Sequence, residues 1–535
     1  MADYERQLIE KLESQQASID KICRIAGVAG ASIGVIHGGE IVYTNHHGFA
    51  DPEQKQKADS STLYGIGSCS KSFFAVAVAN AIVDKKTVEW DEPVRRHLPE
   101  FITSSTMVTD NANLVDIAAH RMGLSGAFHL TFQGDGEHLI KKDDFWKYLP
   151  KLRPVVPFRA SWLYNSHGYS VLGQLLEKVT GKSLQECLDE YVSKPLGLKR
   201  TISKLEFDTT PNFAKPHAAL ADGSLHPLKY RHDFRNHFFE AAAGIYTSLE
   251  DMLTYSKHVL RAASELPPKE HGPIREAGEH YSAHIPIMTP SIRERSYGLG
   301  WIRTQLPGAV GLIGDNSRIA AVQDLPILGE GASSKLALYH QGATVGYFTS
   351  FYLFPETQSG VIVLTNSIAN CDAADFIAQS LIQSLFSDEQ KLDFVQLTER
   401  FCSRCLGFYD QMQQTVETKR QKSPPPRHLA EYTGEYYDDT GLFFIGITCD
   451  PESKEQLKLA FQGLDRHTYS LRYFYDETFE WTLTRDETAK RGRYHQFDQR
   501  YFNFCFNELN GQVVSLSWHH DRNVQQPEVF KKSEM

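Results

Sequence analysis

The sequence is poor in several features that mark particular classes of protein. Its 56 lysines and arginines face 66 aspartates and glutamates, giving a formal net charge of −10 and no basic excess for binding the phosphates of a nucleic acid. It has no apolar run of about 18 residues, the length that a membrane-spanning helix needs. We therefore expect a soluble protein with neither a nucleic-acid partner nor a membrane partner.

The first residues, 1–27, lack the apolar segment and the small-residue cleavage site of a secretion signal. Charged and apolar residues alternate there at helical spacing, which predicts an ordinary amphipathic helix. The eight cysteines are scattered along the chain. Without a secretion signal they indicate reduced thiols rather than a disulfide framework. These absences predict a cytoplasmic location.

At 535 residues the chain exceeds the size at which one hydrophobic core usually stops growing, so we expect at least two domains. Two β-rich runs flank His37-Gly38-Gly39 and predict a hairpin, because a Gly-Gly step tolerates positive φ. Periodicity then predicts helices at 71–84, 168–180 and 248–261, the last begun by Ser248, and strands within 335–366. This order predicts an α/β fold whose sheet is closed by strands distant in sequence.

A second domain is predicted near the carboxyl end. Apolar residues at helical spacing, among them Cys405 and Phe408, precede the stiff sequence Ser423-Pro424-Pro425-Pro426-Arg427. Short runs that alternate apolar and polar residues follow, ending with Val514, Leu516 and Trp518. We expect three parts: a domain large enough to hold an active site at 1–390, a helix and proline-rich linker at 391–427, and an antiparallel β domain or barrel at 428–535.

The stretch Ser68-Cys69-Ser70-Lys71 places a hydroxyl and an amine three residues apart at the start of an apolar helix. On a helix Ser68 and Lys71 would share one face, within reach of each other. A serine is a poor nucleophile unless a neighbour takes its proton, and a desolvated lysine can do so. The pair therefore predicts a nucleophile beside its base.

Two further stretches follow along the chain: Tyr164-Asn165-Ser166 before a helix, and His340-Gln341-Gly342 between strand-like segments. With these the chain resembles the serine β-lactamase and penicillin-binding-protein superfamily, in particular its class C-like branch of related esterases and transacylases. The likeness runs in order over roughly residues 20–385. It includes His120–Leu124, Lys194–Leu198, Ala243–Thr247 and Tyr297–Trp301.

The resemblance implies a fold of the β-lactamase type, an antiparallel sheet flanked by helices with a helical subdomain. Glu431–Tyr436 looks like the opening of the lipocalin-like β domain that often follows such enzymes. Together these imply an α/β large domain and a C-terminal antiparallel β domain.

The resemblance also implies roles for single residues. Ser68 would be the acylated nucleophile, Lys71 its first proton partner and Tyr164 the companion general base. A tyrosine serves as a base only if its phenolate is favoured, and a nearby lysine cation would favour it. His340 takes the place of the family's motif lysine, and the backbone N–H groups of Ser68 and Ala343 would form the oxyanion hole.

Two departures from the family pattern bear on the substrate. Ser166 stands where the family usually has asparagine, and its hydroxyl cannot replace an amide; a one-residue shift that brings Asn165 into the site stays open. His340 removes a permanent cation that could hold a substrate carboxylate. Both departures disfavour penicillin-like acids. The expected substrate-binding residues are Ser166, Gly342, Trp162 and Tyr347.

Other motifs are discounted. Gly30–Gly34 matches G-x-S-x-G but leads into a hairpin rather than the strand-to-helix turn which that motif needs. Cys402 and Cys405 have metal-ligand spacing without a second pair, which favours buried structural thiols. In His46-His47 and His519-His520 adjacent side chains would point to opposite faces of a strand, so they would chelate poorly. We expect no metal and no cofactor.

These observations predict an enzyme, a serine hydrolase that forms an acyl-enzyme on Ser68 and acts on an ester or thioester of a small, fairly apolar metabolite. Three alternatives stay open. One is a transacylase that passes the acyl group to a small-molecule alcohol, and another is a β-lactamase or D-aminopeptidase-like amide hydrolase. The third is a non-catalytic binding or scaffolding protein.

Overall fold

The computed structural model describes residues 2–207, 209–229, 234, 237–265, 272–288, 291–387, 391–451, 453 and 456–533. A nine-stranded sheet organises the large domain, in the order β3-β2-β1-β15-β14-β13-β10-β9-β8, and all its neighbouring strands are antiparallel. Its strands are β1 Gly30–His37, β2 Glu40–Asp51, β3 Gln56–Lys57, β8 Ile285–Pro286, β9 Arg295–Tyr297, β10 Ile302–Leu306, β13 Lys335–Thr344, β14 Tyr347–Phe354 and β15 Ser359–Thr365. The pairing of β1 with β15 confirms that strands distant in sequence close the sheet.

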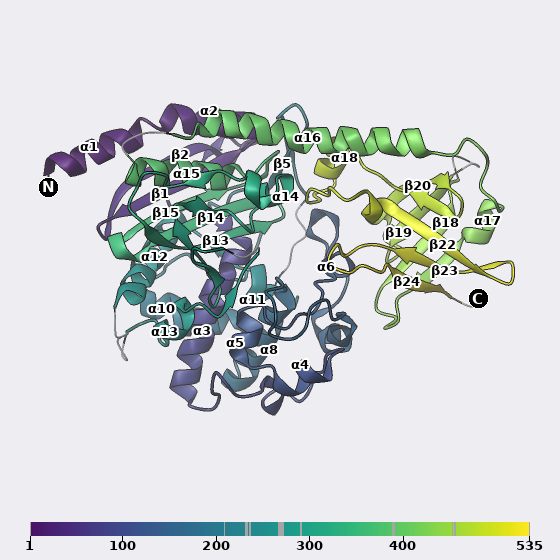
Figure 1. Ribbon diagram of the computed structural model, residues 1–535, viewed down its shortest axis with the longest axis horizontal. Helices are drawn as coiled ribbons and strands as arrows, with labels where there is room; N and C mark the ends of the chain where they lie inside the picture. Colours follow the sequence, from purple (N-terminus) through teal and green to yellow (C-terminus); the bar gives the residue numbers. More distant parts are fainter. Residues whose placement is uncertain are drawn as a thin grey trace.

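Helices cover this sheet and form a separate helical part (Figure 1). The helix α12 packs on β1 and β15, and α15 packs on β14 and β15. The helices α3, α5, α8 and α11 pack together below the sheet in Figure 1. The bounds are α1 Ala2–Glu13, α2 Gln16–Ala26, α3 Ser70–Lys85, α4 Thr106–Asn111, α5 Leu114–Ala118, α6 Phe128–Thr131, α7 Phe145–Tyr148, α8 Ser166–Thr180, α9 Leu184–Leu188, α10 Lys194–Leu196, α11 Glu240–Ala243, α12 Leu249–Ser264, α13 Ala277–Tyr281, α14 Asn316–Ile319 and α15 Ala373–Phe386.

Local sequence signals explain several of these boundaries. The hairpin between β1 and β2 turns at Gly38 and Gly39, which have φ of 59° and 82°. Helix α12 begins as predicted, because the Ser248 hydroxyl accepts the N–H of Asp251, a cap worth about 1 kcal/mol. Helix α8 ends at Gly181, whose φ of 70° suits a residue without Cβ.

Helix α3 is buried on nearly all sides between Ser70 and Ile82. An all-round apolar helix is stable only inside a core, and α3 accordingly contacts α8, α9 and α11. The residues that directly precede α3 are therefore attached to a rigid, fully packed helix.

The carboxyl-terminal residues form a closed eight-stranded barrel, as the alternating pattern predicted: β17 Gly434–Tyr437, β18 Phe444–Cys449, β19 Leu457–Phe461, β20 Thr468–Tyr475, β21 Thr478–Glu480, β22 Asn503–Leu509, β23 Gln512–Trp518 and β24 Glu528–Lys532. Large aromatic side chains fill it, among them Phe461 and Trp518, whose ring centroids lie 5.3 Å apart. One expectation is wrong: Val513, not Val514, is buried, because the pairing of β22 with β23 shifts register there.

A 26-residue helix, α16 (Phe394–Lys419), lies along both the large domain and the barrel (Figure 1). It packs on α2 and α15 at one end and on β20 at the other. Cys402 and Cys405 are buried on its inner face, as structural thiols. The expected boundary at residue 390 lies outside the described residues. Among the described helices, none combines the length and the apolar character needed to cross a membrane.

Buried charged residues join the barrel to the large domain. Arg493 donates to Gln133 Oε1 at 2.6 Å, and Lys151 Nζ lies 2.9 Å from Asp438 Oδ2. The side chains of Lys151 and Asp438 are only 7% and 0% exposed. A buried charge is costly without its partner, so these contacts hold the barrel in one position.

Candidate active site

The candidate nucleophile lies on a tight turn in close contact with the sheet. Residues 67–69 form one turn of 3₁₀ helix before α3, and Gly67 has φ of 48°. A Cβ at Gly67 would lie 2.5 Å from the carbonyl oxygen of Ala343, and one at Gly342 would lie 1.9 Å from that of Ile66. Both glycines are therefore needed for β13 to approach the turn. Gly342 is buried in this contact, whereas Ala343 is exposed at the surface.

Three of the predicted side chains meet at the hydroxyl of Ser68. The Tyr164 hydroxyl donates to Ser68 Oγ at 2.8 Å, and Lys71 Nζ lies 3.0 Å from the same oxygen. The Lys71 ammonium also donates to the carbonyl of Ala242 in α11 at 2.8 Å. Ser68 and Tyr164 are partly exposed, while Lys71 is 0% exposed. A substrate can therefore reach the serine from outside, with the amine behind it.

Burial shifts the pKa values of the two partners in opposite directions. Desolvation lowers the pKa of Lys71 to about 7, so a large fraction of the amine is neutral near neutral pH. Desolvation raises the pKa of Tyr164 well above its usual value, although the hydroxyl of Ser68 opposes this in part. The expectation that the phenolate is favoured is therefore wrong for the resting site, because desolvation is the largest effect on the pKa of Tyr164. In the resting site Tyr164 is a neutral phenol.

His340 lies next to this cluster, but its hydrogen bonds are to other residues. Its Nδ1 donates to the carbonyl of Gln341 at 2.6 Å, and its Nε2 lies 3.0 Å from the hydroxyl of Tyr297. Its ring centroid is 6.3 Å from that of Tyr164. Burial, with the nearby charge of Lys71, lowers the pKa of His340 to about 3. The ring is therefore neutral and supports the wall behind Tyr164.

A chain of hydrogen bonds extends from His340 through two residues whose roles the sequence did not predict. A carbonyl only accepts, so His340 carries its proton on Nδ1, and Nε2 accepts from the Tyr297 hydroxyl. The Tyr297 oxygen also lies 3.3 Å from His120 Nε2, and His120 Nδ1 lies 3.2 Å from the backbone nitrogen and 3.1 Å from the carbonyl oxygen of Asn165. The His120 ring also lies 4.4 Å from that of Tyr164. Both residues belong to stretches that carry the family likeness, which was the available signal.

The structure separates the roles of Asn165 and Ser166. Asn165 is 1% exposed, and its amide donates to the carbonyls of Leu124 and Ser125 at 3.1 and 3.0 Å. Its Oδ1 caps α8 by accepting the N–H of His167 at 2.9 Å. Asn165 is therefore occupied by the fold. Ser166 is partly exposed, and its hydroxyl interacts with Tyr164.

The two aromatic candidates lie in different places. Trp162 is partly exposed, with its ring 5.9 Å from that of Tyr164. Tyr347 is 0% exposed, and its hydroxyl donates to the carbonyl of Ala214 at 2.6 Å. The expectation that Tyr347 contacts the substrate is therefore wrong, because a buried phenol needs a partner and has one in the core.

The discounted motifs have ordinary structural partners. Ser32 lies within β1, with its hydroxyl 3.0 Å from His46 Nδ1 and 3.1 Å from the Tyr64 hydroxyl. His47 contacts Asp20, and His520 contacts Glu528 at 2.8 Å. In the part of the chain that the structure describes, no three His, Cys, Asp or Glu residues are grouped to hold a metal ion.

A family model, two relatives and one solved structure are similar to this chain. A family model described as "Beta-lactamase" matches residues 8–381. "Unguisins hydrolase ungD'" of Aspergillus campestris is 25% identical over 435 residues, which cover 77% of this chain and 73% of that protein. A "Beta-lactamase" of Pseudomonas fluorescens is 22% identical over 65% of this chain and 92% of its own. The "octameric penicillin-binding protein homologue from Pyrococcus abyssi" has a similar fold, with a TM-score of 0.56 at 19% identity over 98% of this chain and 100% of that one.

Proposed function

The chain belongs to the beta-lactamase family, and on that premise we propose that it is a serine hydrolase that forms an acyl-enzyme on Ser68. Its substrate is an ester or thioester of a small, fairly apolar acid. The observation that supports this most directly is that Lys71, fully buried, and Tyr164 both contact Ser68 Oγ within 3.0 Å.

In the proposed acylation the neutral amine of Lys71 takes the proton of Ser68 while Oγ attacks the substrate carbonyl carbon. The negative charge that develops on the carbonyl oxygen is stabilised by the backbone N–H groups of Ser68 and Ala343. The Tyr164 phenol then gives its proton to the departing alkoxide or thiolate, and the Lys71 ammonium returns a proton to the phenolate. Lys71 is neutral again at the end of this half-reaction.

In deacylation the same groups act on water. Lys71 removes a proton from the water that attacks the ester carbonyl of the acyl-enzyme, and Ser68 regains a proton as the acid leaves. The carbonyl of Ala242, 2.8 Å from Lys71 Nζ, keeps the amine directed at the site.

The substrate class rests on the polarity of the site. His340 is neutral and turned toward Tyr297, so it offers no cation for a substrate carboxylate. Asn165 is occupied by the fold, which leaves the shorter hydroxyl of Ser166 in place of an amide. Trp162 adds partly exposed aromatic surface next to Tyr164. These features favour an uncharged, apolar acyl group.

A comparison of substrates tests the proposal. We expect kcat/KM for p-nitrophenyl esters to exceed that for the β-lactam nitrocefin by at least about tenfold, because the site lacks the polar contacts that an amide and a carboxylate need. Faster turnover of nitrocefin would contradict the substrate class. Adding small alcohols and analysing the products separates hydrolysis from acyl transfer, since a transacylase would form a new ester.

The pH dependence of ester turnover is a second prediction. The base must be the neutral amine, so kcat/KM should rise with pH through an apparent pKa of about 7, where Lys71 loses its proton. His340 has a pKa lowered to about 3 and cannot produce this transition. Rates measured between about pH 5 and 9 provide the check. The midpoint should persist in His340→Gln; a midpoint that disappears there would assign the transition to the histidine.

A further inference from the structure

A short segment lies between the catalytic cluster and the barrel. On the cluster side, Asn165, which follows Tyr164, donates to the carbonyls of Leu124 and Ser125. The very next residues contact the barrel: the N–H groups of Gly126 and Ala127 donate to Asp521 Oδ2 at 3.1 and 2.9 Å. The two anchors are adjacent in sequence, so a displacement at one is transmitted to the other.

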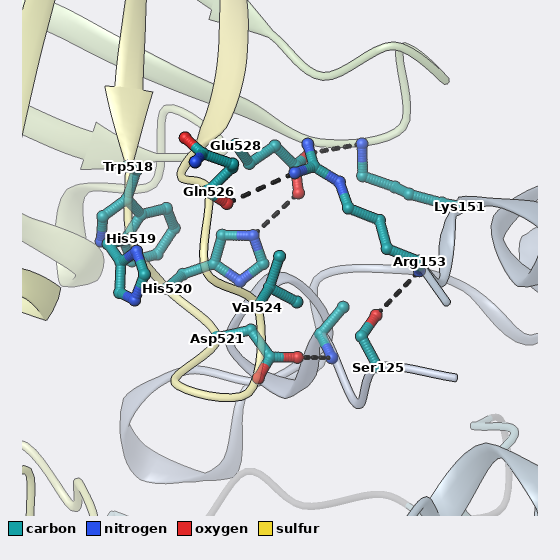
Figure 2. A pocket seen from close by; sticks show the side chains of 11 residues that line it. Ser125, Lys151, Arg153, Trp518, His519, His520, Asp521, Val524, Gln526 and Glu528 are labelled. Atoms are coloured by element: carbon teal, nitrogen blue, oxygen red, sulfur yellow. Dashed lines mark hydrogen bonds and ion pairs between the residues drawn. The ribbon is translucent and has the colours of Figure 1, made fainter. Parts of the chain in front are cut away.

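Asp521 lies in the connection between β23 and β24 and points from the barrel toward the large domain (Figure 2). Its second oxygen, Oδ1, accepts the N–H of Asn523 at 2.9 Å, which fixes the shape of its own loop. Hydrogen bonds from backbone N–H groups to a carboxylate are stronger than neutral ones. One side chain of the barrel thus joins its loop to two consecutive residues of the large domain.

A second link runs parallel to this one. The N–H of Arg153 donates to the Ser125 hydroxyl at 2.9 Å, and its guanidinium donates to the carbonyl of Gln526 in the same barrel loop at 3.4 Å (Figure 2). Farther along the segment, the N–H of Asp135 donates to the carbonyl of Arg491 at 2.9 Å. The barrel therefore holds the segment at several points.

The backbone at Ala127 has a conformation that needs such support. Its φ of 38° and ψ of 36° are left-handed, a conformation that is strained for a residue with a Cβ. Its N–H is bonded to Asp521, and its carbonyl accepts from the hydroxyl of Tyr148 at 3.0 Å. These two bonds offset the strain, and they set the direction in which the chain leaves Ala127.

The next residue, Phe128, presents aromatic surface to solvent. Phe128 is 37% exposed, and its ring stacks on that of Phe239, with 6.0 Å between the ring centroids and 23° between the ring planes. Phe239 directly precedes α11, whose Ala242 carbonyl accepts from Lys71. The exposed ring is thus tied to the helix that orients the proposed base.

We propose that Asp521 is a positioning residue that places Phe128 as part of the surface that receives the acyl group of the substrate. The barrel then determines which acyl chains bind well, and an apolar chain long enough to pack on the Phe128 ring is favoured over acetyl. This inference rests on the proposed function and identifies the part of the site that determines specificity for the acyl group.

The test compares p-nitrophenyl acetate with p-nitrophenyl octanoate in full-length variants. Asp521→Ala should lower the ratio of octanoate to acetate kcat/KM by about tenfold, mainly through a higher KM for octanoate, because the ring is displaced. Asp521→Asn keeps an acceptor oxygen and should lower the ratio by about threefold or less. The matched control is Asp486→Ala, which removes another barrel carboxylate that accepts a backbone N–H of the large domain, that of Ala221 at 2.8 Å. It should leave the ratio unchanged.

Phe128→Ala should reproduce the lowered ratio without altering the barrel, so the test holds even if Asp521→Ala fails to fold. A ratio that is unchanged in Phe128→Ala, or in a folded Asp521→Ala, overturns the inference. Labelling by a fluorophosphonate separates the two levels of the argument. If the wild-type chain is not labelled at Ser68, the proposed function itself fails; if it is labelled and the ratio does not change, only the role of Asp521 and Phe128 fails.

Discussion

Ser68→Ala should lose ester turnover by about 10³-fold or more and should lose its fluorophosphonate label completely. The substitution removes the oxygen that Tyr164 and Lys71 both contact, so no acyl-enzyme can form at this position. Mass spectrometry of the labelled wild-type protein should find the adduct on the peptide that contains Ser68. Steady-state rates with an aryl ester give the size of the loss.

Ser72→Ala is the matched control, because it removes a hydroxyl from the first turn of α3, just after the turn that carries Ser68. Its hydroxyl donates to the carbonyl of Cys69 at 2.9 Å, within its own turn. This variant should keep both the label and most of the activity. Label that persists at another residue in Ser68→Ala would disprove the assignment of the nucleophile and would indicate a different site.

Lys71→Met should lower ester turnover by about 10³-fold and at the same time stabilise the fold. The methionine has a similar length but no charge to desolvate. Burial lowers the pKa of Lys71 from 10.5 to about 7, so below pH 7 the folded protein holds a buried ammonium that the unfolded chain holds in water. Each pKa unit corresponds to about 1.4 kcal/mol, so we expect a gain of up to ~5 kcal/mol at acidic pH.

The pH dependence of the stability gain distinguishes an effect of the buried charge from an effect of packing. Between pH 7 and 10.5 the unfolded chain binds more protons at Lys71 than the folded one, so the stability of the wild type rises with pH in this range. The advantage of Lys71→Met should therefore be largest near pH 6 and smaller near pH 9, as measured by urea unfolding. Lys178→Met, at a lysine whose side chain is 46% exposed, should show no such trend. An equal gain at both pH values would mean that packing rather than charge is responsible.

The sequence predicted the features that depend on neighbouring residues. The ends of α8 and α12 follow from Gly181 and Ser248, and the hairpin follows from its Gly-Gly step. The pair Ser68 and Lys71 was found because both lie within one turn of chain. Such signals are local, so they survive without knowledge of the tertiary fold.

Properties that depend on burial could not be predicted in this way. Whether Tyr164 is a phenol or a phenolate is decided by desolvation, and whether Tyr347 meets the substrate is decided by the core around Ala214. The contact of Asp521 with Gly126 joins positions on two different domains. No periodicity or spacing marks such a contact, because Asp521 accepts a backbone N–H there, a group that every residue except proline carries.

The close approach of the Ser68 turn to β13 has a consequence for biosynthesis. The glycines at 67 and 342 that permit this contact are separated by most of the large domain, and β15, which completes the sheet beside β1, ends only at Thr365. A ribosome delivers residues in order, and long-range sheet pairing must wait for the last strand. A nascent chain halted before β15 has its serine but not the completed sheet that holds β13 against the Ser68 turn. Reactivity is therefore acquired only after at least 365 of the 535 residues have been translated.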